Sequence, residues 1–191
     1  MAQLTSRIKV VSMDLELSTE HDLCCDLIFR NLMAEIRGGI YAAVMAAPPC
    51  STFTGARRQS PGDGHNCPGP LRTAYGSGRY GLSTLLPPDR ERVRIGTLLA
   101  VRTAMILKEC RRLRIPFVYE TPREISDDAP NMLYLDEFEE LMKDEQIVMI
   151  TVDQCRFGAA TTKPTALLLF GIDAEEAFPS EERRCNNPRQ Q

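Results

Sequence analysis

Residues 87–120, PPDRERVRIGTLLAVRTAMILKECRRLRIPFVYE, decide the fold that the sequence predicts. Two prolines open a stretch in which apolar residues recur at helical spacing, and this predicts a long helix that ends near Arg114. The β-branched and aromatic residues at 115–119 follow at once and predict a strand that ends in Glu120. A helix that leads directly into a strand is typical of an α/β fold.

The same alternation continues toward the N-terminus. Residues 8–13 and 40–47 are apolar runs of strand length, and an amphipathic helix that begins near Ser18 separates them. Residues 51–88 hold 7 of the 12 glycines of the chain and predict a long loop. A loop of this length inside a compact domain is often functional.

Toward the C-terminus, residues 134–145 predict a helix, and residues 147–152 and 165–170 predict strands. Strands that alternate with helices predict a doubly wound, mostly parallel α/β sheet with helices on both faces. We therefore expect one domain over residues 1–172. The acidic and then polar tail, residues 173–191, is expected to be loose.

The composition is that of an ordinary globular protein. The chain has 191 residues, of which 43% are hydrophobic and 26% charged, and it has no apolar run long enough for a membrane helix. Its N-terminus lacks the apolar segment of a signal peptide. Seven cysteines without regular spacing then indicate reduced thiols in an intracellular protein, in the cytoplasm or the nucleus.

Charge is unevenly distributed along the chain. Residues 57–123 hold 13 basic and 5 acidic residues, whereas the whole chain has a formal net charge of −3. A basic middle segment favours a face that binds an anion, with nucleic acid the commonest large one. The alternative is that these arginines coat a solvated helix, and charge alone leaves both open.

Three residues with reactive side chains follow predicted strands, namely Asp14, Cys50 and Glu120. In parallel sheets, ligands bind beyond the carboxyl ends of the strands. Cys50 comes after two prolines that stiffen its approach, so a thiol there is well placed to act as a nucleophile if neighbouring cations stabilise its thiolate. The alternative is a small buried hydrophobe in a turn.

Three segments, in chain order, resemble the cytosine-5 DNA methyltransferases. Residues 48–54, PPCSTFT, resemble the family's Pro-Cys loop, and residues 119–122, YETP, lie where the family has Glu-Asn-Val. Residues 157–165, FGAATTKPT, resemble its aromatic-Gly-x-Pro-Gln-x-Arg-x-Arg segment. The resemblance covers about residues 8–171 and implies a Rossmann-like methyltransferase sheet.

The resemblance also implies a reaction and its residues. The Cys50 thiolate would add to C6 of cytosine, Glu120 would hydrogen-bond or protonate N3, and C5 would take a methyl group from S-adenosylmethionine. Asp14, Asp22 (alternatively Asp26) and Pro48 match the cofactor site. The candidate nucleic-acid contacts are Arg57, Arg58, Arg123 and Lys163, with Arg72 and Arg79 of the loop as further phosphate contacts.

The chain departs from the family at both ends. The family begins with a strand and a Phe-x-Gly-x-Gly loop that holds the cofactor, and this sequence has neither. We therefore expect a sheet that is incomplete at its N-terminal end. The chain is then a fragment, a partner of a second polypeptide that supplies the missing motif, or a degenerate relative. No room remains for a target-recognition domain after the last predicted strand.

Two functions remain open at this stage. The first is S-adenosylmethionine-dependent methylation of cytosine C5 in nucleic acid, with DNA favoured over RNA. The second is a catalytically impaired, methyltransferase-like nucleic-acid-binding module. No metal site is expected, because His65, Cys67 and the later cysteines do not have the spacing of a zinc motif.

Overall fold

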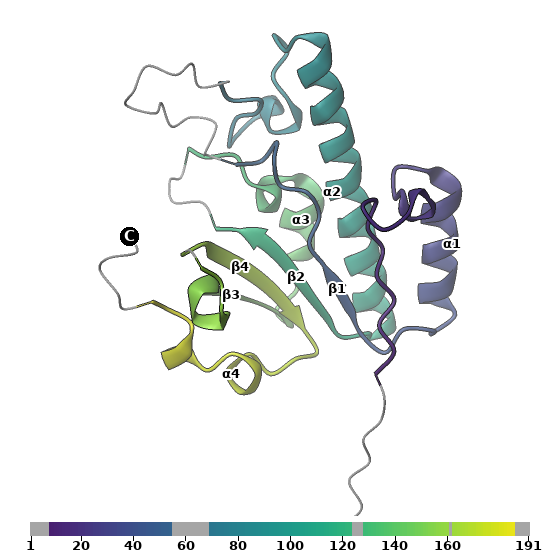
Figure 1. Cartoon of the computed structure of the whole chain (residues 1–191), viewed down its shortest axis with the longest axis vertical. Coiled ribbons are helices and arrows are strands. Elements are labelled where there is room, and N and C mark those ends of the chain that lie inside the picture. Colours follow the sequence, from purple (N-terminus) through teal and green to yellow (C-terminus); the bar gives the residue numbers. More distant parts are fainter. Residues whose placement is uncertain (1–7, 55–68, 124–127, 161, 186–191) are drawn as a thin grey trace, which may run out of the picture.

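The computed structural model describes residues 8–54, 69–123, 128–160 and 162–185. These residues form a mixed α/β fold around a four-stranded sheet (Figure 1). The strands are β1 (Val44–Ala46), β2 (Phe117–Pro122), β3 (Ile147–Asp153) and β4 (Pro164–Phe170). The helices are α1 (Asp26–Arg37), α2 (Pro87–Leu113), α3 (Asp136–Leu141) and α4 (Ala174–Ala177).

The sheet has the strand order β1-β2-β4-β3 and is parallel only at its β1 end. β1 pairs with β2 in parallel, with Ala46 opposite Tyr119. β4 is antiparallel to both of its neighbours, β2 and β3. The prediction of a mostly parallel sheet is therefore wrong for the described strands. The connection from β3 to β4, residues 154–163, carries no crossover helix, and a short connection of this kind joins antiparallel strands.

Helices cover both faces of the sheet, as predicted. α1, α2 and α3 contribute Phe29, Leu107 and Phe138 to the main core, which packs on one face of the sheet. On the opposite face, α4 and Phe178 cover a smaller core formed by β3 and β4. Figure 1 shows α4 in front of the sheet and α2 behind it.

The long helix α2 agrees closely with its prediction. Two prolines occupy its first turn, where the missing N–H groups cost no helical hydrogen bond. It ends at Arg114, which adopts the left-handed conformation with φ of 60°. Of the helices in the described residues, none is both long and apolar enough to pass through a bilayer.

The N-terminal part departs most from expectation. Residues 8–13 are extended but form no strand, although they lie beside β1 (Figure 1). β1 itself covers only three residues of the predicted run 40–47, and it lies at the edge of the sheet rather than in its interior. Met45 on β1 is 74% exposed. The prediction of a strand at 8–13 is therefore wrong in the described residues. The strand predicted at 40–47 is confirmed only over Val44–Ala46, which pairs with β2 and is only partly buried.

The expectation of a loose tail is wrong for residues 173–185. The Asp173 side chain accepts hydrogen bonds from two backbone N–H groups and so caps α4. The Cys185 N–H donates to the Asp153 carboxylate at 2.8 Å, and Arg184 forms an ion pair with the same carboxylate. These contacts fasten the tail to the end of β3.

Candidate functional site

The turn that carries Cys50 follows β1 directly. Cys50 is half-buried and packs against the main core. The Phe53 N–H donates to the Cys50 carbonyl at 2.8 Å, which closes a tight turn after the two prolines. Thr52 and Phe53 are buried. The Cys50 side chain therefore lies in a turn that is anchored on its C-terminal side, at the rim of the core.

Glu120 lies on β2, the strand next to β1, and is half-buried. Its Oε1 atom accepts a hydrogen bond from Lys163 Nζ at 3.2 Å, in an ion pair, and one from Gln154 Nε2 at 3.4 Å. Among the described residues, the ion-pair partner of Glu120 is Lys163 rather than an arginine of α2. Because β1 and β2 are parallel, Glu120 and the Cys50 turn lie at the same edge of the sheet.

Tyr119 is the buried residue of β2 that precedes Glu120. Burial raises the pKa of Tyr119, and the nearby charges of Glu120 and Cys50 raise the pKa further. Tyr119 belongs to the main core, where its ring stacks at a tilt on Phe138. The Tyr119 phenol therefore stays neutral in the core beside the strand end that carries Glu120.

The antiparallel pair β2–β4 places two of the predicted cations. The Arg123 N–H donates to the Pro164 carbonyl at 2.9 Å, so Arg123 and Lys163 flank the joined ends of the two strands. The Arg123 side chain is exposed, and Lys163 is bound to Glu120. Their contact with nucleic acid stays a prediction. Arg57 and Arg58 lie outside the described residues, as do His65 and Cys67.

A cavity of about 340 Å³ brings together the three residues predicted for the cofactor. Asp14, Asp22 and Pro48 all line it, together with apolar residues of α1, β1 and α2. His21 Nδ1 lies 3.2 Å from the Asp14 carbonyl oxygen and closes the loop between the two aspartates. The alternative residue, Asp26, instead forms an ion pair with Arg102. The cavity thus favours Asp22 over Asp26.

Each of these two carboxylates has one oxygen engaged in a local turn. Asp14 Oδ1 accepts from the Glu16 N–H at 2.9 Å, and Asp22 Oδ1 accepts from the Cys24 N–H at 2.8 Å. Such turns fix the direction of the carboxylate, and the Cys24 side chain forms a further hydrogen bond with Asp22. A carboxylate has about four acceptor positions, so both aspartates can still accept from another donor. A ligand that carries hydroxyl or amino donors on an apolar body suits this arrangement.

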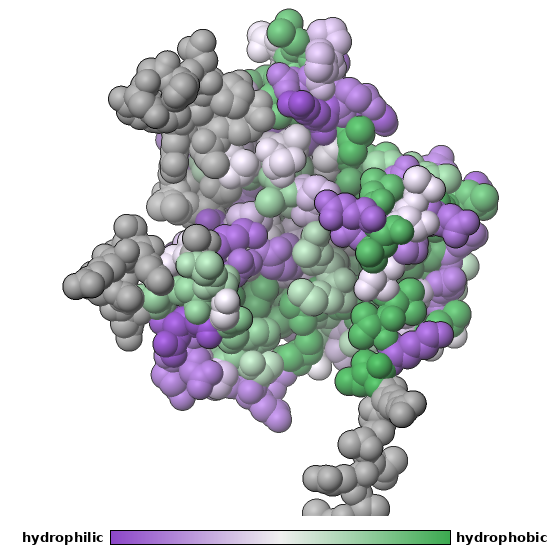
Figure 2. Space-filling model, viewed as in Figure 1, coloured by the Kyte–Doolittle hydropathy of each residue, from purple (hydrophilic) through white to green (hydrophobic). Residues whose placement is uncertain are grey.

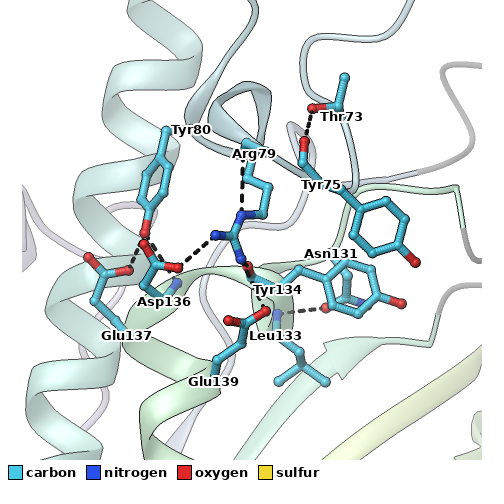
Figure 3. Close-up of polar contacts among 11 residues, drawn as sticks. Thr73, Tyr75, Arg79, Tyr80, Asn131, Leu133, Tyr134, Asp136, Glu137 and Glu139 are labelled. Atoms are coloured by element: carbon cyan, nitrogen blue, oxygen red, sulfur yellow. Dashed lines mark hydrogen bonds and ion pairs between the residues drawn. The ribbon is translucent and has the colours of Figure 1, made fainter.

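The loop residues Arg72 and Arg79 both bind protein groups in the structure. Arg79 forms ion pairs with Asp136 at 2.7 Å and with Glu139 at 3.0 Å, and its neighbour Tyr80 donates to Glu137 at 2.9 Å. Figure 3 shows these side chains docking the loop onto α3. Arg72 is fully buried. The prediction that Arg72 contacts phosphate is therefore wrong, whereas the phosphate contact of Arg79 stays a prediction.

Sequence reasoning missed Gln154 near the site and gave Arg72 a surface role instead of a buried one. Gln154 lies in the short connection after β3 and reaches Glu120 across the sheet end. No pattern marks either residue, although the apolar neighbours Pro70, Leu71 and Ala74 are a weak indication that Arg72 is buried. Within the described part of the chain, no three His, Cys, Asp or Glu side chains gather as metal ligands.

Comparisons with protein-family models, with curated proteins and with solved structures find nothing that matches this chain.

Proposed function

We propose that this protein methylates C5 of cytosine in nucleic acid, DNA rather than RNA, through a covalent adduct of Cys50. One observation carries the proposal. The parallel register of β1 and β2 brings the Cys50 turn and Glu120 to one edge of the sheet, beside a cavity that Asp14, Asp22 and Pro48 line. The resemblance of residues 48–54, 119–122 and 157–165 to the cytosine-5 methyltransferases supports the same assignment.

The chemistry needs a nucleophile and an acid on opposite sides of one base. The Cys50 sulfur adds to C6, and the electron pair of the C5–C6 double bond moves so that C5 becomes nucleophilic. Glu120 stabilises the charge that develops at N3 by a hydrogen bond or by proton transfer. Methyl transfer would leave the demethylated thioether of the cofactor. A water molecule would then take the C5 proton, its electron pair would restore the C5–C6 double bond, and the C6–S bond would break to release the Cys50 thiolate. The target base must leave the stack to reach Cys50.

The lining of the cavity supports the assignment of the cofactor that this reaction needs. Two carboxylates suit the ribose hydroxyls and the adenine amino group, and the apolar wall suits the adenine ring. S-adenosylmethionine, when bound, supplies the methyl group. Asp14 and Asp22 would hold its nucleoside part, and Pro48 would lie between that part and the thiol turn.

The open edge of β1 supports the expectation of an incomplete sheet. Among the described strands, β1 has a neighbour on one side only, and the resemblance puts a further strand and the cofactor's glycine loop on the other. That a second polypeptide supplies this strand stays a prediction.

Transfer of labelled methyl groups tests the proposal. Wild-type protein with S-adenosylmethionine and cytosine-containing DNA is expected to label C5, and Cys50→Ala is expected to abolish the labelling. Cys110→Ala is the matched control, because Cys110 is a buried core thiol on α2. Equal labelling by Cys50→Ala and wild type would overturn the mechanism.

A second function, a catalytically impaired nucleic-acid-binding module, is favoured by the same open edge. An incomplete cofactor site with an exposed Asp14 would bind S-adenosylmethionine weakly. This alternative predicts salt-sensitive DNA binding that survives Cys50→Ala, with no cofactor binding detectable by calorimetry. Micromolar cofactor affinity would exclude it.

A further inference from the structure

Arg72 is a buried cation whose hydrogen-bond partners among the described residues are all neutral. Its side chain is 0% exposed, and within the described residues its hydrogen bonds go to one hydroxyl and two carbonyl oxygens. Burial lowers the pKa of Arg72 to about 10, so it stays protonated at neutral pH. A buried charge without a counter-ion is costly, and an apolar side chain would fill the same space at lower cost. Stability alone therefore does not explain why an arginine occupies this buried position.

The guanidinium joins three separate segments. Nε and Nη2 donate to Thr52 Oγ1 at 3.3 and 3.2 Å, Nη1 donates to the Arg79 carbonyl, and Nη2 donates to the Val93 carbonyl, the last two both at 2.9 Å. Thr52 belongs to the turn that carries Cys50, whereas Val93 belongs to α2. Only a planar fork of donors reaches acceptors in three directions at once.

Phe53 and Gly96 complete the arrangement. The Arg72 guanidinium lies 3.7 Å from the centre of the Phe53 ring, which favours a cation over the ring face. A Cβ at Gly96 would lie 2.6 Å from Thr52 Oγ1. The turn after Cys50 is therefore held against α2 on one side and against the guanidinium on the other.

We propose that Arg72 is the positioning residue of the Cys50 turn, acting through Thr52 and Phe53. This inference rests on the proposed function, in which the direction of the Cys50 side chain decides catalysis. The Phe53 N–H to Cys50 carbonyl bond links the anchored pair to Cys50 itself. Displacement of a nucleophile by about 1 Å is enough to cost a large factor in rate.

Alkylation of Cys50 by iodoacetamide, resolved by site with mass spectrometry, tests the proposal on the full chain. Thr52→Val removes the hydroxyl that Arg72 holds but keeps the size of the side chain, and it is expected to change the Cys50 alkylation rate at least fivefold. Thr52→Ser keeps the hydroxyl and is expected to stay within twofold of wild type. Arg72→Met is expected to match Thr52→Val.

Arg102→Met is the matched control for loss of a buried arginine. Arg102 also lies over a phenylalanine ring, that of Phe29, but it pairs with Asp26 and does not touch the Cys50 turn. The Arg102→Met variant is expected to lower the melting temperature but to change the alkylation rate of Cys50 by no more than twofold. An unchanged Cys50 rate in both Arg72→Met and Thr52→Val would overturn the proposal. If Arg72→Met does not fold, the Thr52 pair decides the matter alone.

The alkylation experiment needs neither cofactor nor nucleic acid, so its outcome is separate from that of the proposed function. A protein without methyl transfer whose Cys50 rate responds to Thr52→Val would contradict the function and support the positioning role. In an active protein, Thr52→Val is expected to lower kcat about 100-fold while KM for DNA stays within threefold. If Thr52→Ser lowered kcat and the melting temperature as much as Thr52→Val does, the result would contradict the positioning role.

Discussion

At the scale of the residue, the site depends on a few polar contacts at the end of β2. The Glu120 carboxylate is held by Lys163 and Gln154, which come from the segment between β3 and β4. Sequence reasoning predicted Cys50, Glu120 and Lys163 because short motifs mark them. It missed Gln154 and the role of Arg72, because their partners are distant in the chain and no local pattern records them.

The first prediction concerns Glu120. Glu120→Gln keeps the shape but cannot carry charge or donate a carboxyl proton, so we expect methyl transfer to fall about 100-fold. Initial rates with labelled cofactor measure the effect. Glu137→Gln is the control, since Glu137 pairs with Tyr80 on α3. A Glu120→Gln rate above half that of wild type would contradict the assigned role.

At the scale of the element, α2 is the helix against which the site is built. Its prolines and its apolar spacing made it predictable almost to the residue. α1 was predicted to begin near Ser18, but Ser18 caps a short 3-10 helix, Thr19–His21, and α1 begins later, at Asp26. Ser18 does cap a helix, although a shorter one than predicted. The turn around Asp22 that separates this helix from α1 has no hydrophobic periodicity by which the sequence could have shown it.

The second prediction concerns the close contact of α2 with the Cys50 turn. Gly96→Ala places a methyl group against Thr52 Oγ1, and we expect a loss of about 1–3 kcal/mol in the free energy of unfolding. Thr97→Val on the same helix removes a buried hydroxyl that has no hydrogen-bond partner among the described residues, so it is expected to be neutral or stabilising. Urea denaturation measures the free energy of unfolding of both variants. An unchanged free energy of unfolding for Gly96→Ala would contradict the close approach of Gly96 to Thr52.

The third prediction concerns the ion pairs between α1 and α2. Hydrogen bonds from Arg112 and Arg37 lower the pKa of Glu109 to about 2. Because the folded pKa lies below the usual value, the stabilisation is full at neutral pH and is lost as pH falls from about 4.5 toward 2. Glu109→Gln should cost about 1 kcal/mol at pH 7 and only a small part of that at pH 2, where the carboxylate is half protonated. Unfolding measured across this range checks the sign, and a cost that grows with acidity would contradict it.

At the scale of the whole molecule, the sheet is open along β1. Exposed apolar residues of the N-terminal segment, among them Ile8, Val10 and Val11, lie beside this edge, and Figure 2 shows hydrophobic surface along the segment. The sequence predicted alternating strands and helices correctly in kind. It did not predict that β4 runs antiparallel between β2 and β3, because strand order depends on pairings that hydrophobic periodicity does not encode.

The fourth prediction concerns the cavity between this segment and the sheet. Asp22→Ala is expected to weaken S-adenosylmethionine binding at least tenfold, because it removes a carboxylate from the cavity wall. Glu176→Ala is the control, since Glu176 lies on α4 on the opposite face of the sheet. Isothermal titration calorimetry measures both. Equal affinities would place the cofactor elsewhere or exclude it.

The central claim is that Cys50 forms a bond to C6 of a cytosine whose C5 then accepts a methyl group. A DNA oligonucleotide with 5-fluorocytosine tests it most directly, because the fluorine at C5 cannot leave as a proton does and the adduct persists. With S-adenosylmethionine present, we expect intact-mass spectrometry to find protein joined to the oligonucleotide with one added methyl group, and peptide mapping to place the bond at Cys50. Absence of the adduct with wild type, or an equal yield with Cys50→Ala, would contradict the account.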